Sequence, residues 1–171
     1  KLLRLAQITS GTMRLDSGGE ARVSWAKYNL LLEVREDLPA DEPVVCFCRF
    51  HCDLDSVHAA ARALRRGSAE LSGRRNELAE WQAGEGPPIL AAQMQAGSLG
   101  ISLVRARYAI YVSVGFSLGD YEQSRARLVR PGQNRPGTFI HLLMRGTVDE
   151  RVRRALDERA EIVAYVIADM G

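Results

Sequence analysis

At 171 residues and 18.9 kDa, the chain is long enough for one good hydrophobic core but short for two. Its apolar fraction of 46% and charged fraction of 26% exclude a disordered or fibrous protein. The formal net charge is only +2, so any affinity for nucleic acid must come from a local patch of charge. We find no signal peptide and no apolar run of about 18 residues, and therefore expect a cytoplasmic protein with reduced thiols.

Helical and strand-like patterns alternate along the chain. Helical spacing and helix-end signals fall at residues 24–37, at 53–66, in a stretch that ends near Trp81, at 118–129 and at 147–167. Short, continuous apolar runs predict strands at residues 43–48, 69–71, 87–93, 108–114 and 137–144. This alternation predicts an α/β fold in which helices cover both faces of a mostly parallel sheet. In such sheets, ligands bind beyond the carboxyl ends of the strands.

Local signals refine the ends of these elements. Asp53 is a candidate N-cap for the helix at 53–66, and Thr147 and Glu150 have the spacing of a capping box. The stretch DSGGEA, residues 16–21, indicates a flexible turn. We therefore divide the chain into a helical lead-in and turn, residues 1–22, and a lobe, residues 23–171.

Three cysteines, Cys46, Cys48 and Cys52, lie close together. An odd number at this spacing does not indicate a disulfide framework. With His51 they could form a metal cluster, but no second pair of ligands follows at the spacing of a zinc site. A Cys-x-Cys pair inside an apolar run favours a buried strand, and we expect no metal site.

Arginines are crowded in the stretch EQSRARLVRPGQNRPG, residues 122–137. On a helix, Gln123, Arg127 and Arg130 project within about 60° of one another, and Arg125 falls on the opposite side. A Pro-Gly pair then ends the helix. Because guanidinium forks match phosphate oxygens, the shared face is a candidate phosphate site. A solvated basic helix face is the alternative.

A second informative stretch, QAGSLGISL at residues 95–103, follows a predicted buried strand. Gly97 and Gly100 let the backbone approach a ligand closely, and exposed N–H groups in such a turn favour anions. No Gly-Lys-Ser or Gly-Lys-Thr follows, so this is not a Walker A loop.

Together, these stretches resemble the second RecA-like lobe, or helicase C domain, of superfamily 2 helicase-like ATPases of the SWI/SNF type, which also occur in bacteria and phages. QSRARLVRPGQ looks like motif VI, Q-x3-R-x2-R-x-G-Q, and QAGSLGISL is similar to motif V, A-G-G-x-G-L-N-L. Weaker matches are VVCFCRFHCDLDSV to motif IV, LSGRRNELAEW to the G-S-x-x-x-R block, GTVDERV to G-T-I-E-E-R-I, and LRLAQITSG to the lead-in. The resemblance covers nearly the whole chain and implies a RecA-like three-layer α/β/α domain.

The chain departs from the family pattern at a few positions. Ser98 replaces a Gly, Ser102 replaces an Asn, and Val129 stands where the remodellers have His. The sequence also contains no Walker A lysine and no DExx motif of the first-lobe type. The resemblance therefore implies that ATP and Mg²⁺ are bound mainly by a first lobe outside these 171 residues, and that the isolated chain is inactive.

The resemblance also implies roles for individual residues. Arg130 would be the arginine finger and Arg127 a second phosphate contact, both stabilising charge on the γ-phosphoryl group. Gln123, Gly97 and Gly100 would shape the ATP-binding side.

Five further residues would contact the backbone of one strand of double-stranded DNA, which positions a protein without reading bases. These are Arg49, Gly73, Arg75, Gln95 and Ser98. Solvated loops are the alternative. The implied protein is a nucleoid-associated translocase without a membrane partner.

Two other functions stay open. A solitary lobe could serve as a non-enzymatic module that binds DNA or protein. A lobe of a DEAD-box RNA helicase would share the arginines, but that family ends the motif in H-R-x-G-R-x-x-R rather than in R-x-G-Q.

Overall fold

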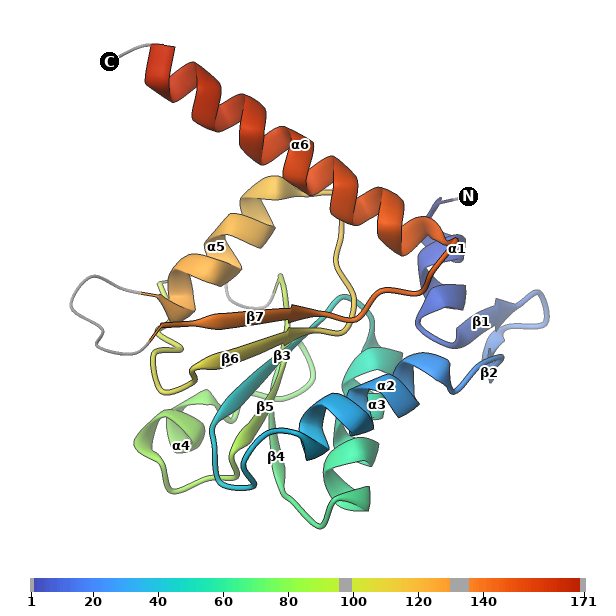
Figure 1. The fold of residues 1–171 in the computed structure, drawn as a ribbon. Coiled ribbons are helices and arrows are strands. Elements are labelled where there is room, and N and C mark those ends of the chain that lie inside the picture. Colours follow the sequence, from blue (N-terminus) through green and yellow to red (C-terminus); the bar gives the residue numbers. More distant parts are fainter. Residues whose placement is uncertain (1, 96–99, 130–135, 170–171) are drawn as a thin grey trace.

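The computed structural model describes residues 2–95, 100–129 and 136–169, with side chains up to residue 160. A parallel five-stranded sheet in the order β4–β5–β3–β6–β7 forms its centre (Figure 1). The strands are β3 (Val44–Cys48), β4 (Ser68–Leu71), β5 (Ile89–Gln93), β6 (Tyr108–Tyr111) and β7 (Thr138–His141). The helices are α1 (Leu2–Thr9), α2 (Ala26–Glu36), α3 (His51–Ala63), α4 (Leu78–Ala83), α5 (Leu118–Leu128) and α6 (Val148–Asp169). The predicted α/β fold is confirmed.

Alternating side chains of the sheet form two hydrophobic cores. Val45 and Phe47 of β3 face a cluster that includes Trp81 of α4, Leu128 of α5 and Leu156 of α6. The neighbouring residues of β3 face the other side, where α2 and α3 contribute a second cluster. Because both faces are covered, every residue of β3 is buried, as its continuous apolar run predicted. The result is a three-layer α/β/α arrangement, from which the far end of α6 projects (Figure 1).

The N-terminal lead-in differs from the prediction. Residues 16–21 are not a free turn but belong to an antiparallel hairpin of β1 (Thr12–Leu15) and β2 (Gly19–Arg22). Leu15 pairs with Gly19, and Gly18 takes a left-handed conformation with φ of 82°. A three-residue hairpin loop requires that conformation, which glycine adopts at little cost. The division of the chain at residue 22 stays a prediction.

The helix starts follow their sequence signals only in part. α3 begins at His51, so the expectation that Asp53 is the N-cap is wrong. Asp53 instead accepts the N–H of Phe50 at 3.1 Å from within the first turn. At α6, Thr147 Oγ1 accepts the N–H of Asp149, and Glu150 accepts the N–H of Gly146, each at 3.2 Å. These two residues therefore cap α6, with each bond shifted by one residue from the usual capping box.

The three cysteines are buried and free, and two of them lie in β3. Over the described residues, no three His, Cys, Asp or Glu side chains gather in a group that could hold a metal ion. The same part of the chain contains no helix long and apolar enough to span a membrane.

Candidate functional site

A pocket of about 270 Å³ lies at the carboxyl ends of β3 and β5, as expected for a parallel sheet. It brings together two of the predicted DNA-contacting residues, Arg49 after β3 and Gln95 after β5. The loop from β6 to α5 forms the opposite wall, where Gly115 lies against the guanidinium of Arg49. A Cβ atom at Gly115 would lie 3.7 Å from the Arg49 side chain, which is ordinary van der Waals contact. One arginine, two glutamines (Gln93 and Gln95) and one aspartate (Asp120) therefore line the pocket at the carboxyl edge of the sheet.

The backbone of Arg49 is fixed by a buried polar cluster behind the pocket. Its N–H donates to Ser113 Oγ at 2.8 Å, and the Ser113 hydroxyl donates to the carboxylate of Asp53. Burial raises the pKa of Asp53, although the bonds from Ser113 and Phe50 and the charge of Lys27 oppose this shift. These contacts join the loop after β3 to the loop after β6. Sequence reasoning missed the roles of Asp53 and Ser113 here.

The arginines predicted on α5 lie far from this pocket along the helix. The first turn of α5 reaches the pocket through Asp120, and the helix runs from there toward the start of β7 (Figure 1). Arg127 lies in the last turn, at the other end of the helix. Gln123 is exposed, but Arg127 is only 6% exposed. These two side chains, predicted to share one face of the helix, therefore differ in exposure, and the phosphate contact of Arg127 stays a prediction. Burial lowers the pKa of Arg127, and the charge of Asp120 opposes this shift.

Backbone contact joins the two informative stretches of the sequence. The N–H of Leu103, at the end of the stretch 95–103, donates to the carbonyl of Arg127 at 2.9 Å. Within that stretch, Gly100 has φ of 43° and open space around its Cβ position. Gly100 is therefore explained by its backbone conformation rather than by a close approach. Gly97, Ser98 and Arg130 lie outside the described residues.

Aromatic residues of the sheet hold α5 in place. The hydroxyl groups of Tyr111 and Ser124 are 2.7 Å apart, and both residues are fully buried. Tyr121 OH lies 3.1 Å from His141 Nε2 and accepts a hydrogen bond from Arg153 of α6 at 2.8 Å. Burial, and then the charge of Arg153, lower the pKa of His141 to about 4. At neutral pH His141 is therefore a neutral ring stacked on Tyr111.

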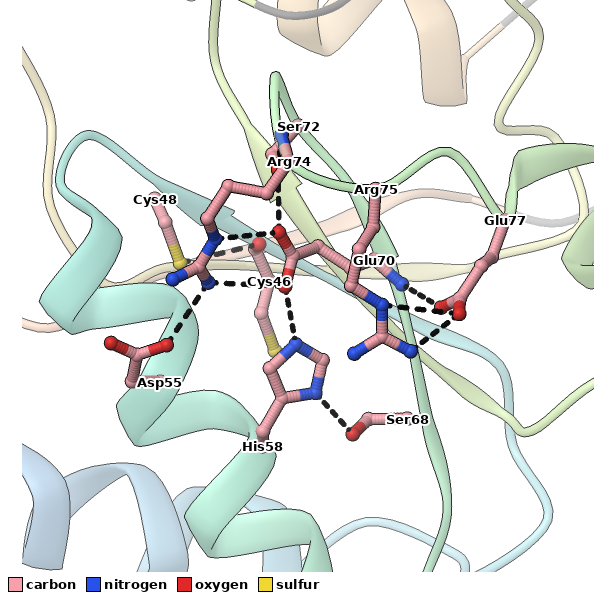
Figure 2. Close-up of polar contacts among 10 residues, drawn as sticks. All are labelled: Cys46, Cys48, Asp55, His58, Ser68, Glu70, Ser72, Arg74, Arg75 and Glu77. Atoms are coloured by element: carbon pink, nitrogen blue, oxygen red, sulfur yellow. Dashed lines mark hydrogen bonds and ion pairs between the residues drawn. The ribbon is translucent and has the colours of Figure 1, made fainter.

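Gly73 and Arg75 do not line the pocket, because they follow the edge strand β4. Arg75 donates through Nε and Nη2 to Glu77, as Figure 2 shows. Gly73 has a negative φ and open space at its Cβ position, so nothing in the described structure requires glycine there.

Arg125, expected to be an ordinary surface charge, is exposed and pairs with Glu122 at 3.6 Å.

The chain is similar in sequence to chromatin-remodeling ATPases. It is 30% identical over 102 residues to the Chromatin-remodeling ATPase INO80 of Mus musculus, a match that covers 60% of this chain and 6% of the relative. It is 31% identical over 101 residues to the protein of the same name from Saccharomyces cerevisiae, covering 59% of this chain and 7% of the relative. The chain therefore corresponds to only a small part of these proteins. No protein-family model matches the chain.

The fold is also found in a solved structure, the C-terminal part of the Fun30 ATPase domain. The two share a TM-score of 0.68 and 22% sequence identity, and the match covers 76% of this chain and 45% of that chain. The phage or bacterial origin that the resemblance suggested stays a prediction. The sequence similarity to SWI/SNF-type ATPases and the shared RecA-like fold together support a helicase C-like lobe.

Proposed function

We propose that this chain is the second motor lobe of a DNA-dependent ATPase that translocates along double-stranded DNA. Its sequence relatives are ATPases, which supports ATP hydrolysis by a larger protein that contains this lobe. The observation that carries the proposal is the bond between Leu103 and Arg127, because it couples the glycine-containing stretch directly to the arginine helix. The same coupling would let one lobe respond to both nucleotide and DNA.

In this proposal, ATP is shared with a first lobe that supplies most of the phosphate contacts and the Mg²⁺ site. Guanidinium groups of this lobe would meet the phosphate end of the nucleotide, whose oxygens they match in charge and shape. Arg130 and Arg127 would stabilise the charge that spreads over the γ-phosphoryl oxygens in the transition state. Arg127 would need a lobe movement or a side-chain rearrangement to reach that position, since it is buried here.

DNA would lie across the carboxyl edge of the sheet. Arg49 and Gln95 share a pocket there, and their donor groups suit phosphate oxygens. Arg75 would join them through Nη1, because its Nε and Nη2 donate to Glu77.

The test is ATP hydrolysis by the full-length protein with Arg130→Ala or Arg127→Ala. We expect turnover to fall by about 10³-fold or more for Arg130→Ala, with little change in ATP binding. Arg125→Gln is the matched control, because Arg125 is an exposed arginine on the same helix as Arg127. Unchanged turnover in Arg130→Ala would reject the finger assignment. A full-length protein without DNA-stimulated hydrolysis would instead indicate a non-enzymatic binding module. The isolated chain is expected to fold but not to hydrolyse ATP.

A further inference from the structure

A second hollow, of about 650 Å³, opens between α3 and the edge strand β4, away from the pocket described above. Four arginines line it: Arg62, Arg66, Arg74 and Arg75. Two carboxylates, Asp55 and Glu70, also line it, so the charge of its lining is net positive. Neither the proposed ATP site nor the pocket at the carboxyl edge includes this surface.

Two of these arginines are held in place by carboxylates. Arg74 donates Nε and Nη2 to Glu70, each at 3.2 Å, and Nη2 also donates to Asp55 at 3.0 Å. Arg75 is held in the same manner by Glu77, and the carboxylate of Glu77 is fixed in turn by the backbone N–H of Glu70 at 2.8 Å. Figure 2 shows both guanidinium groups bound along one edge. Their side-chain entropy is thus already reduced before any ligand arrives.

The other edge of each guanidinium is available. Within the described part of the chain, Nη1 of Arg74 and Nη1 of Arg75 have no hydrogen-bond partner, and Figure 2 draws no contact to them. Arg62, across the hollow on α3, makes no side-chain hydrogen bond or ion pair with the same described residues. Arg66 uses one donor for the carbonyl of Arg35 at 2.8 Å. Free guanidinium donors on both sides of a hollow suit an anion with several oxygens.

Glu70 keeps its charge in this arrangement. Burial alone would raise its pKa, but hydrogen bonds from Arg74, Ser72 and His58 outweigh burial and lower the pKa of Glu70 to about 2. The carboxylate therefore holds Arg74 at neutral pH.

Next to the hollow, Arg65 has φ of 53° and is the only residue other than glycine with a positive φ in the described structure. This left-handed residue turns the chain from Arg62 to Arg66 at the end of α3.

We propose that the hollow binds a chain of phosphate groups between Arg62 and Arg66 on one side and the carboxylate-held Arg74 and Arg75 on the other. Its volume exceeds that of the pocket at the carboxyl edge, which leaves room for more than one phosphate. The same chemistry occurs in free polyphosphates and in a nucleic acid backbone. The site shares Arg75 with the proposed DNA contacts, but Arg62, Arg66 and Arg74 lie outside them, and phosphate binding here does not require ATP hydrolysis.

The test is calorimetric titration of the purified chain with tripolyphosphate and, separately, with a short DNA duplex. Arg62→Gln and Arg75→Gln each remove a guanidinium from the hollow, and their double variant removes one from each side. Arg154→Gln is the control, because Arg154 is an exposed arginine on α6 and outside the hollow. Arg62→Gln breaks no hydrogen bond or ion pair of the described structure, so its melting temperature should equal that of the wild type.

We expect the double variant to bind at least one ligand about tenfold more weakly or worse, with the control unchanged. A loss confined to tripolyphosphate identifies a free phosphate chain as the ligand, and a loss confined to the duplex identifies a nucleic acid backbone. Equal affinities of the wild type and the double variant for both ligands would overturn the proposal. So would an equal loss in Arg154→Gln, because binding would then depend on overall charge.

Discussion

Replacing Glu70 with Gln removes the charge at the centre of the cluster in Figure 2 while keeping the size of the side chain. Glu70 is 1% exposed and faces His58 from α3, and Ser72 and Arg74 from the loop after β4. Its pKa is lowered from 4.5 to about 2, which corresponds to about 3 kcal/mol of folding free energy at neutral pH. Because the folded pKa lies below the unfolded one, this contribution is complete above about pH 4.5. It is lost as the pH falls toward 2.

The difference between wild type and Glu70→Gln isolates this contribution from that of other carboxylates. We expect urea unfolding, followed by the fluorescence of the buried Trp81, to show a destabilisation of up to about 3 kcal/mol at pH 7. Between pH 4 and pH 3 the stability of the wild type should fall faster than that of the variant, by about 1 kcal/mol per pH unit. If the stabilities of the wild type and the variant fell in parallel over this range, the pKa of Glu70 would be the same in the folded and unfolded states.

Three further predictions concern other parts of the molecule. Lys27 is buried and lies 2.7 Å from the Asp149 carboxylate, so Lys27→Met should lower the free energy of urea unfolding by about 3 kcal/mol. Asp149→Leu should then cost far less in the Lys27→Met variant than in the wild type, and additive costs would contradict a coupled pair. Arg65→Gly relieves a left-handed conformation and should raise stability by about 0.5–1 kcal/mol in thermal melts, whereas a lower melting temperature would refute strain there. Binding of the isolated chain to duplex DNA should be weak and fall steeply with salt in fluorescence anisotropy; salt-independent binding would argue against phosphate contacts.

Periodicity and apolar runs were sufficient to predict the central sheet and its covering helices. β3 and β5 are continuous apolar runs because both of their faces are buried, so they stand out in the sequence. The hairpin of β1 and β2 was missed because its strands are short, largely exposed and charged. The Gly18-Gly19 pair at the end of the loop and the start of β2 was the available signal, since short loops with glycine often join antiparallel strands.

The polar clusters could not be predicted, because they join residues that are far apart in the chain. Lys27 pairs with Asp149, and Thr9 donates to the same carboxylate across 140 positions. Ser113 meets Asp53 only because β3 and β6 are neighbours in the sheet. Helical spacing likewise placed Arg127 on the same face as Gln123, which is exposed. The spacing carries no information on what covers the last turn of α5.

The position of Arg127 follows from contacts that different parts of the chain make with α5. Ser124 is fixed by Tyr111 of β6, and Tyr121 is fixed by His141 of β7, so the helix can neither rotate nor slide without breaking a buried hydrogen bond. Its last turn is then tied to Leu103 through the backbone. A displacement of the segment at Leu103 would therefore be transmitted to Arg127 directly, without a side chain in between. If DNA contacts are coupled to α5, a substitution of the Leu103 side chain should weaken that coupling less than an insertion or deletion in the same segment.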